Sequence, residues 1–517
     1  MTRDVAEAAT ATGAVRGVRG VRGVREDGIT VFRGIPFARP PVGALRFAAP
    51  EPPEPWDGVR PATRFGPPPP QSSRLGLAVP ETTGDDWLTC NVWTPDPGGA
   101  GLPVMVWVYG GAYITGHASA PEYDGTALSR DGVVIVTFNY RVAMEGFGQI
   151  EGAPANRGLL DQVAALTWVH ANIAAFGGDP GNVTVFGESA GAGSIAALLA
   201  MPSAEGLFHR AIMQSVPGPF FSRPLADDIG SVIAAEALTS LRDDPTALPA
   251  NPLGHGRGQR LPTREDLAAL TPTHLMRIVD QVIATMADHP RWGQVAHTVT
   301  PFSPVVDGDV LPRTPWEAVK AGASRDIPLV LGHNRDEYRL FTALQGRLTD
   351  HQAATALQIF APDPAAYRAT FPDASPETLY ELVLSDWLFR MPTLHLAEAH
   401  ATAGGRVHLY ELAWQGGPLG ACHALDVPLV WGNLTGGIAD FLITDTTEAA
   451  ALSATIRTAW TTFAKTSAPG WPPFDTSQHL THVLDTTPTT TPYPNNHSRA
   501  LWSTHTFAPL PLTQDSP

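Results

Sequence analysis

The sequence has 517 residues, of which 43% are hydrophobic and 16% charged, so it is too apolar for a disordered chain and can bury a large core. Its formal net charge of −16 argues against a nucleic-acid partner. No apolar stretch approaches the roughly 18 residues of a membrane span, and the N-terminal residues MTRDVAEAATATG lack the apolar segment of a secretory signal. The two cysteines, Cys90 and Cys422, cannot form a disulfide framework. These features predict a soluble cytoplasmic protein without a membrane or nucleic-acid partner, and the scarcity of lysine hints at a G+C-rich bacterial source.

The N-terminal half predicts a buried sheet. Residues 1–14 are expected to be a flexible tail, and the short repeat AVRGVRGVRGVRE is expected to be a basic lead into the first strand. GITVFRGIPF then predicts a strand, followed by LTCNVWTP, LPVMVWVYGG and GVVIVTFNYRV. The last two are nearly continuous runs of apolar residues, which is typical of strands buried on both faces of a mainly parallel sheet.

Helices alternate with strands in the rest of the chain. Leu160, Val163, Leu166, Val169 and Ile173 recur at helical spacing and predict a helix between residues 156 and 176. NVTVFG then predicts a strand, SAGAGSIAALLAM a helix, and IPLVLGHN and RVHLYELAW two later strands. PTALPANPLGHGRGQRLPT and DTTPTTTPYPNNH are expected to be irregular surface segments. The alternation predicts an α/β fold, and no change of composition divides the 517 residues into separate domains.

The stretch GESAG places Ser189 between a predicted strand and a predicted helix. A nucleophile elbow has this arrangement, in which a sharp turn exposes the serine Oγ and leaves no room for a Cβ on the flanking glycines. The alternative is a glycine-rich turn that binds phosphate or serves only packing. The elbow is favoured because a strand precedes the serine and a helix follows it.

An acyl-transfer nucleophile also needs hydrogen-bond donors for the oxyanion. The strand that ends in WVYGGAYITG lies upstream of the serine, as the α/β-hydrolase arrangement requires. The backbone N–H groups of Gly111, Ala112 and Ala190 are therefore expected to converge on one oxygen, an arrangement in which each donor contributes about 3 kcal/mol to the transition state.

Nearly the whole chain, from about Thr30 to Phe474, resembles the type-B carboxylesterases, the family of cholinesterases and bacterial para-nitrobenzyl esterases. The stretches that carry the resemblance include FRGIPFARPPVGALRF, YGGAYITG, the long GLLDQVAALTWVHANIAAFGGDPGNVTVFGESAGA, GHNRDE, ACHALDVPLVWG and WTTFAKT. The resemblance implies a single α/β-hydrolase domain over residues 1–517, with a large, mostly parallel sheet and long excursions that form an active-site gorge.

The resemblance also implies the remaining catalytic residues. It gives Glu337 of GHNRDE as the acid and His423 of ACHALDVP as the base, and each follows a predicted strand in the order serine, acid, histidine. Asp336, next to Glu337, is the alternative candidate for the catalytic acid. Glu188 is expected to support the turn that carries Ser189. Cys422 is expected to be an inert buried thiol.

The sequence departs from the family near the site. Pro69 and Trp87 stand where the family often has a disulfide, which fits a reducing compartment and puts a large aromatic near the entrance, where it is expected to contact ligand. Glu145 stands at a usually apolar position, and Tyr338 and Val216 stand at usual glycines. These changes predict a reshaped pocket without loss of a catalytic group.

The predicted function is that of a serine carboxylesterase that forms an acyl-enzyme on Ser189 and needs no cofactor or metal. Its substrate is expected to be a small molecule, an uncharged aromatic or medium-chain ester, bound among Tyr113, Phe220, Phe221, Phe341 and Trp414. Two alternatives stay open. One is a biosynthetic tailoring enzyme of the same fold, acting as an acyltransferase, lactonase or cyclase. The other is a non-catalytic binding module, which is disfavoured because the triad is present.

Overall fold

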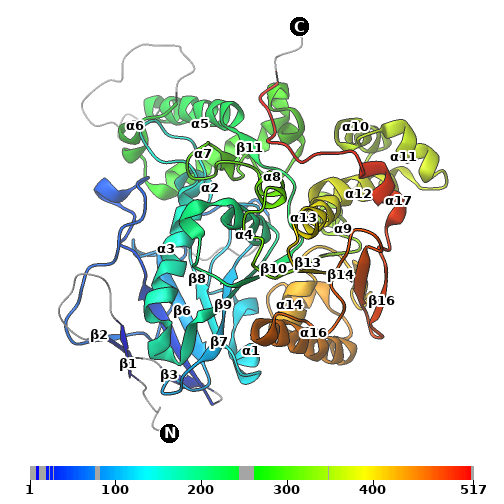
Figure 1. Ribbon diagram of the computed structural model, residues 1–517. Helices are drawn as coiled ribbons and strands as arrows, with labels where there is room; N and C mark the ends of the chain where they lie inside the picture. Colours follow the sequence, from blue (N-terminus) through cyan, green and yellow to red (C-terminus); the bar gives the residue numbers. More distant parts are fainter. Residues whose placement is uncertain are drawn as a thin grey trace.

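A large mixed β-sheet with helices on both faces forms the centre of the molecule (Figure 1). The computed structural model describes residues 7–10, 19–22, 24–26, 28–75, 82–243, 261–346 and 348–513. The strands are β1 (Glu7–Thr10), β2 (Arg19–Arg22), β3 (Val24–Glu26), β4 (Ile29–Pro36), β5 (Val59–Pro61), β6 (Thr89–Thr94), β7 (Leu102–Val108), β8 (Val134–Phe138), β9 (Gly178–Glu188), β10 (Arg210–Gln214), β11 (Phe221–Ser222), β12 (Val305–Val306), β13 (Leu329–Asn334), β14 (Val407–Leu412), β15 (Leu480–Leu484) and β16 (Thr489–Pro492).

The helices connect and cover these strands. The α-helices are α1 (Thr126–Arg130), α2 (Ala143–Gly146), α3 (Arg157–Asn172), α4 (Ala190–Ala200), α5 (Arg223–Asp243), α6 (Arg264–Ala268), α7 (Pro272–Ala284), α8 (Pro315–Lys320), α9 (Arg339–Gln345), α10 (Asp350–Phe360), α11 (Pro364–Thr370), α12 (Pro376–Ser385), α13 (Met391–Thr402), α14 (Asp426–Trp431), α15 (Ala439–Leu442), α16 (Thr446–Thr466) and α17 (Asn496–Trp502). Two further helical segments matter for the site: the 3₁₀ segment η6 (Pro290–His297) and the π-helix η7 (Asp386–Arg390).

The central sheet has the strand order β16-β15-β14-β13-β10-β9-β7-β8-β6-β4-β3. The seven neighbouring strands from β15 to β8 in that order are parallel, and the pairs at either end of the sheet are antiparallel. Parallel strands all deliver their following loops to one edge of the sheet. The loops after β9, β13 and β14 therefore meet there.

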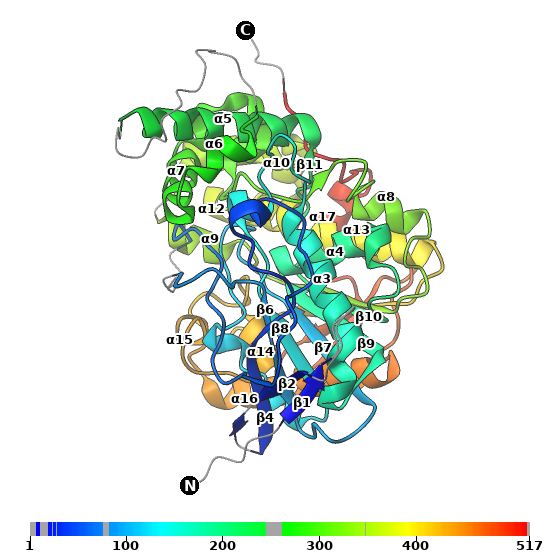
Figure 2. The same ribbon diagram turned by 90° about the vertical axis from the view of Figure 1, so that its left-hand side faces the viewer.

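Burial explains the nearly continuous apolar runs. Every residue of β8 and all but the first two of β7 are buried, because helices cover both faces of the sheet. Figure 2 shows α14 and α16 on one side of the sheet and α3 and α4 on the other. Between β7 and α14 the ring of Trp107 packs edge-on against Trp431 at 5.4 Å, which fixes that helix on the sheet.

The main strands and helices predicted from the sequence are confirmed. The predicted helix between residues 156 and 176 is α3 with a following 3₁₀ turn, and the predicted elbow helix is α4. Strands β10 and β15 carry weaker patterns and were not predicted. The tract DTTPTTTPYPNNH, expected to be irregular, contains β16, which pairs with β15; that part of the prediction is wrong.

The N-terminal segment also differs from the expectation. Residues Glu7–Thr10, expected to belong to a flexible tail, form β1 and pair with β2 inside the glycine-arginine repeat. Alternating burial along β1 explains the pairing, since Ala8 and Thr10 face the interior. The rest of residues 1–14, and most of the segment PTALPANPLGHGRGQRLPT, lie outside the described residues.

Two groups of helices extend beyond the sheet. Figure 1 shows α5, α6 and α7 gathered at the end of the molecule opposite the N-terminus, and α10, α11 and α12 as a separate group at the upper right. These insertions agree with the excursions expected from the sequence. Within the described residues, no helix is long and apolar enough to cross a membrane.

Candidate active site

Ser189 occupies a strained turn between β9 and α4. Its φ and ψ angles are 55° and −125°, a conformation that residues with a Cβ rarely adopt. A Cβ added at Gly187 would lie 2.6 Å from the carbonyl oxygen of Val108, and one at Gly191 only 2.0 Å from it. The structure thus confirms that both glycines are needed for the close approach of this turn to β7.

A glycine-rich loop after β7 lies directly against the elbow. A Cβ at Gly110 would lie 3.1 Å from the Cβ of Ser189, and Gly111 has a φ of 116° that favours glycine. The backbone N–H groups of Gly111, Ala112 and Ala190 donate to no other group in the described part of the chain. Ala112 and Ala190 line the same pocket as Ser189, and Gly111 precedes Ala112 in the loop.

His423 and Glu337 meet across the loops that follow β14 and β13. The Nδ1 atom of His423 lies 2.6 Å from Glu337 Oε2. The other oxygen of Glu337 accepts hydrogen bonds from the Ser215 hydroxyl at 2.6 Å and from the Asn334 amide at 2.8 Å. Burial would raise the pKa of this carboxyl, but the facing imidazole and the three hydrogen bonds lower it below its ordinary value. The carboxylate is therefore kept ionised and fixed in orientation.

Asp336 faces away from His423. Its carboxylate lies 3.2 Å from Nη2 of Arg335 and 3.4 Å from Nη2 of Arg339, and it accepts a hydrogen bond from the Ala421 amide. The two neighbouring acidic residues thus have different partners, and Glu337 is the one in contact with the imidazole.

Glu188 contacts the other ring nitrogen of His423. Its Oε1 lies 3.0 Å from Nε2, although the angles are not those of a hydrogen bond. Burial, reinforced by nearby carboxylates, raises the pKa of Glu188 to about 8. Burial disfavours the imidazolium, but the carboxylates of Glu188 and Glu337 outweigh this effect and raise the pKa of His423 to about 9. Glu188 was expected only to brace the elbow, and this contact was not predicted.

Two aromatic rings flank the imidazole. The ring of Phe389 stacks on His423 with a centroid distance of 4.1 Å and an angle of 21°, and Phe341 lies 5.3 Å from the same ring. Phe389 belongs to the π-helix η7, whose Asp386 and Arg390 form a buried ion pair on the turn. This anchored turn holds Phe389 against His423.

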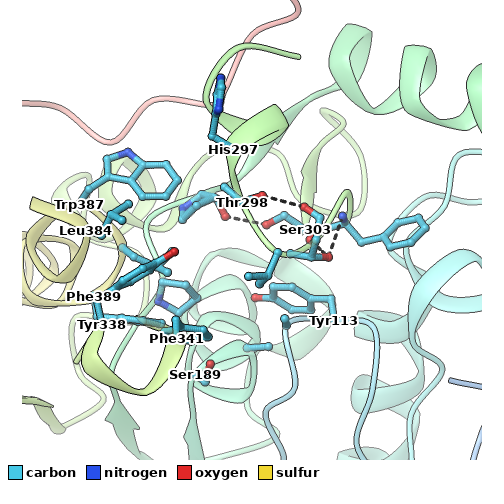
Figure 3. Close-up of a pocket in the computed structure, with 18 of the residues that line it drawn as sticks. Tyr113, Ser189, His297, Thr298, Ser303, Tyr338, Phe341, Leu384, Trp387 and Phe389 are labelled. Carbon is cyan, nitrogen blue, oxygen red and sulfur yellow. Dashed lines mark hydrogen bonds between the residues drawn. The ribbon is translucent and has the colours of Figure 1, made fainter. Parts of the chain in front are cut away.

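A cavity of about 680 Å³, including its open mouth, lies over Ser189 (Figure 3). We call it the Ser189 pocket. Its polar lining is confined to a few hydroxyl groups and His297, and the remaining walls are apolar. The aromatic residues that line it are Tyr113, Phe221, Phe302, Tyr338, Phe341, Trp387 and Phe389. The pocket has no charged side chain in its lining, which suits an uncharged ligand.

Three of the five residues expected to contact substrate line this pocket: Tyr113, Phe221 and Phe341. The other two do not. Phe220 turns away and packs edge-on against Trp316, and Trp414 is buried with its indole N–H donating to Glu448. Side chains alternate along an extended segment, so Phe220 and Phe221 point to opposite sides.

Most of the residues that sequence reasoning missed come from two distant segments. One wall consists of His297, Thr298, Val299, Thr300, Phe302 and Ser303, and another of Leu384, Trp387, Leu388 and Phe389. Both segments join the site only through tertiary packing. The sole local signal is Tyr338, which stands where the family usually has glycine and which lines the pocket.

Two other departures have structural explanations. Trp87, expected to contact ligand, is 1% exposed, does not line the pocket, and donates its indole N–H to the Gly84 carbonyl. Glu145 forms a buried ion pair at 2.7 Å with Arg46, which explains a charge at that position. Cys422 is buried, and burial raises the pKa of its thiol to about 12, so it is no nucleophile.

The described residues contain no group of three or more His, Cys, Asp or Glu side chains arranged to hold a metal ion. The groups brought together around Ser189 can support acyl transfer: a hydroxyl that lines the pocket from a strained turn, amides without another partner among the described residues, and an imidazole oriented by a carboxylate.

The chain is similar in sequence and in structure to known esterases. The model of the Carboxylesterase family matches residues 4–502. The chain is 39% identical to the para-nitrobenzyl esterase of Bacillus subtilis (strain 168), with 89% of this chain and 92% of that protein covered. It is 35% identical to the phenmedipham hydrolase of Pseudarthrobacter oxydans, covering 87% and 90% respectively. A solved PNB esterase structure superimposes with a TM-score of 0.79 and 36% identity, covering 96% of this chain and 99% of that one.

Proposed function

Since the chain belongs to the carboxylesterase family and is a serine carboxylesterase of the α/β-hydrolase fold, we propose that Ser189, His423 and Glu337 are its catalytic triad. The observation that carries this proposal is the 2.6 Å hydrogen bond between His423 Nδ1 and Glu337, formed beside the elbow that presents Ser189. The contact of His423 with Glu188, the residue next to Ser189, puts the ring within reach of the elbow.

In the first half of the reaction, Ser189 Oγ attacks the ester carbonyl while His423 Nε2 takes its proton. The negative charge that develops on the carbonyl oxygen is stabilised by the amides of Gly111, Ala112 and Ala190. These groups have no other partner among the described residues, so they need not break a hydrogen bond to act. The imidazolium then gives its proton to the leaving alkoxide, and an acyl-enzyme on Ser189 remains.

In the second half, water replaces the alcohol. His423 Nε2 takes a proton from the water, which attacks the acyl carbonyl, and the proton then returns to Ser189 as the acid product leaves. Glu337 holds the Nδ1–H tautomer throughout and stabilises the imidazolium in both steps. Its own hydrogen bonds from Ser215 and Asn334 keep it in position.

The substrate class follows from the Ser189 pocket. An uncharged ester with an aromatic or aliphatic group fits a lining that is apolar apart from scattered hydroxyls and His297. A charged group would lose hydration there without gaining an ionic partner.

Hydrolysis is favoured over acyl transfer, lactone formation or cyclisation, because the relatives above are named as esterases and a hydrolase. A cytoplasmic location belongs to the same proposal. Its support is that Cys90 and Cys422 are both free and buried, as in proteins of reducing compartments.

The test is hydrolysis of 4-nitrophenyl butyrate by the purified protein. Ser189→Ala should lower kcat/KM by roughly 10⁴-fold or more, with an unchanged melting temperature. Ser231→Ala is the matched control, because Ser231 lies on α5 and bonds only the Asp227 carbonyl of its own helix. Equal activity of Ser189→Ala and the parent would refute the proposal.

A further inference from the structure

A second cavity lies next to the Ser189 pocket, and His297 lines both. This second cavity is an open hollow of about 780 Å³, a volume that includes solvent at its mouth. Its walls come from η6, from Ile359 near the end of α10, and from Leu510, Pro511 and Thr513. Most of these residues are apolar, and no charged side chain is among them.

The walls of the second cavity are fixed by hydrogen bonds. The side-chain amide of Gln294 donates to the carbonyl of Ile359 at 3.0 Å, which ties η6 to α10. The backbone amide of Thr513 donates to the carbonyl of Arg291 at 2.8 Å, which ties the C-terminal segment to η6. Three segments that are distant in sequence are thus joined around one apolar hollow.

The two cavities share more than His297. Phe221 lines the Ser189 pocket and forms an isolated parallel β-bridge with Leu510, which lines the second cavity. The Leu510 amide also donates to the Phe220 carbonyl at 2.7 Å. One strand-like pair therefore separates the two spaces at this point, and His297 stands where they adjoin.

His297 lies between the two cavities, and nothing in the described part of the chain holds its side chain in a position that would block a ligand extending from one cavity into the other. Its side chain is exposed and makes no hydrogen bond, ion pair or ring contact with other described residues. Figure 3 shows the ring directed away from Ser189, beyond Thr298. The protein around it still removes part of the ring's hydration, which lowers the pKa of His297, so the ring is neutral at pH 7 and presents no charge to an apolar chain.

We propose that the second cavity is a binding subsite for the far end of a long, apolar ester, whose reacting carbonyl lies at Ser189 and whose chain passes His297. The proposal rests on the proposed esterase function and adds a substrate class to it. An apolar chain gains free energy for each methylene removed from water, and the second cavity offers apolar walls beyond the Ser189 pocket. Short esters end within the Ser189 pocket and do not reach it.

The test fills the second cavity and leaves the Ser189 pocket intact. Ile359→Trp places a large side chain in it from α10, and Thr513→Trp does so from the C-terminal segment. Val59→Trp is the matched control, since Val59 is an exposed apolar residue on β5 that lines neither cavity. The measurement is kcat/KM for 4-nitrophenyl butyrate and 4-nitrophenyl dodecanoate, and for butyl acetate and dodecyl acetate.

Both cavity variants should lower kcat/KM for a twelve-carbon ester by about tenfold or more, and should change that for the four-carbon esters by less than about twofold. The nitrophenyl esters differ in their acyl chain, and the acetates differ in their alcohol chain. The series that shows the loss therefore identifies which of the two chains enters the subsite. Turnover of the short ester also reports that each variant is folded. Equal effects on short and long esters, or none in either variant, would overturn the subsite. If short esters were turned over without Ser189, the proposed triad itself would fail, which is a separate result.

Discussion

The Nε2 atom of His423 lies 3.0 Å from Oε1 of Glu188, and the opposite nitrogen of the same ring lies 2.6 Å from Glu337. The imidazole is therefore held between two carboxylates. When ionised, each favours the protonated imidazole, whereas the base in acyl transfer must have Nε2 free of a proton. The arrangement stabilises the imidazolium that forms during the reaction. It also raises the pH at which His423 loses its proton and becomes the free base.

This contact predicts an alkaline activity profile. Because the pKa of His423 is raised to about 9, kcat/KM should rise as the pH is increased toward that value. Glu188→Gln replaces one of the two carboxylates with a neutral side chain of similar size. The pH range over which kcat/KM rises should therefore move to lower pH by about one unit or more. The measurement is the pH dependence of kcat/KM for 4-nitrophenyl butyrate. Coincident limbs in parent and variant would show that Glu188 does not influence the base.

The acid can be distinguished from its neighbour. Glu337→Gln should lower kcat by roughly 10³-fold or more, because an amide cannot both hold the Nδ1–H tautomer and stabilise the imidazolium. Asp336→Asn should cost less than about fivefold, since this carboxylate pairs with Arg335 and Arg339 and not with the imidazole. Steady-state kinetics of the two variants decide the matter. A larger loss at Asp336 would reverse the assignment.

The ion pair between Arg46 and Glu145 gives a prediction about stability. Both side chains are buried, and Arg46 also donates to the carbonyls of Leu267 and Leu270. Arg46→Met leaves the Glu145 carboxylate buried without its partner, so it should lower the free energy of unfolding by about 3–5 kcal/mol. The double variant Arg46→Met/Glu145→Leu should recover much of this loss. Chemical denaturation measures both, and an unchanged stability in the single variant would show that the pair is dispensable.

The two cysteines should remain unpaired. Cys90 lies in β6 and Cys422 precedes His423, and both are buried and free. Dithiothreitol should therefore leave the melting temperature and the activity of the protein unchanged. A drop of several degrees on reduction would reveal a stabilising disulfide and would contradict the proposed cytoplasmic location.

The sequence predicted those parts of the protein that local chemistry determines. Gly187 and Gly191 flank Ser189 because the turn against β7 excludes a Cβ, and this requirement is visible as a pattern. The buried strands β7 and β8 are visible as apolar runs for the same reason. Strand β16, three threonines followed by a proline at the sheet edge, has no such pattern and was expected to be irregular.

The pocket was predictable only in part, because its walls come from segments far apart in the chain. Nothing in the sequence around Phe389 marks it as a partner of His423, since the stacking depends on the π-helix η7. Phe220 and Trp414 were plausible as aromatic residues near the motifs, but their side chains point into the core. Arg46, the partner of Glu145, lies ninety-nine positions away in the sequence, so the motif that contains Glu145 gives no sign of this ion pair.

The most direct test of the proposed mechanism is covalent labelling by a fluorophosphonate, followed by mass spectrometry of the digested protein. The reagent reacts with a serine that is activated by a neighbouring base and faced by oxyanion donors. One phosphonyl group per chain on Ser189, with matching loss of esterase activity and no labelling of Ser189→Ala, is the result predicted. An adduct on Cys422 or on another serine, or full activity after complete labelling, would contradict the account.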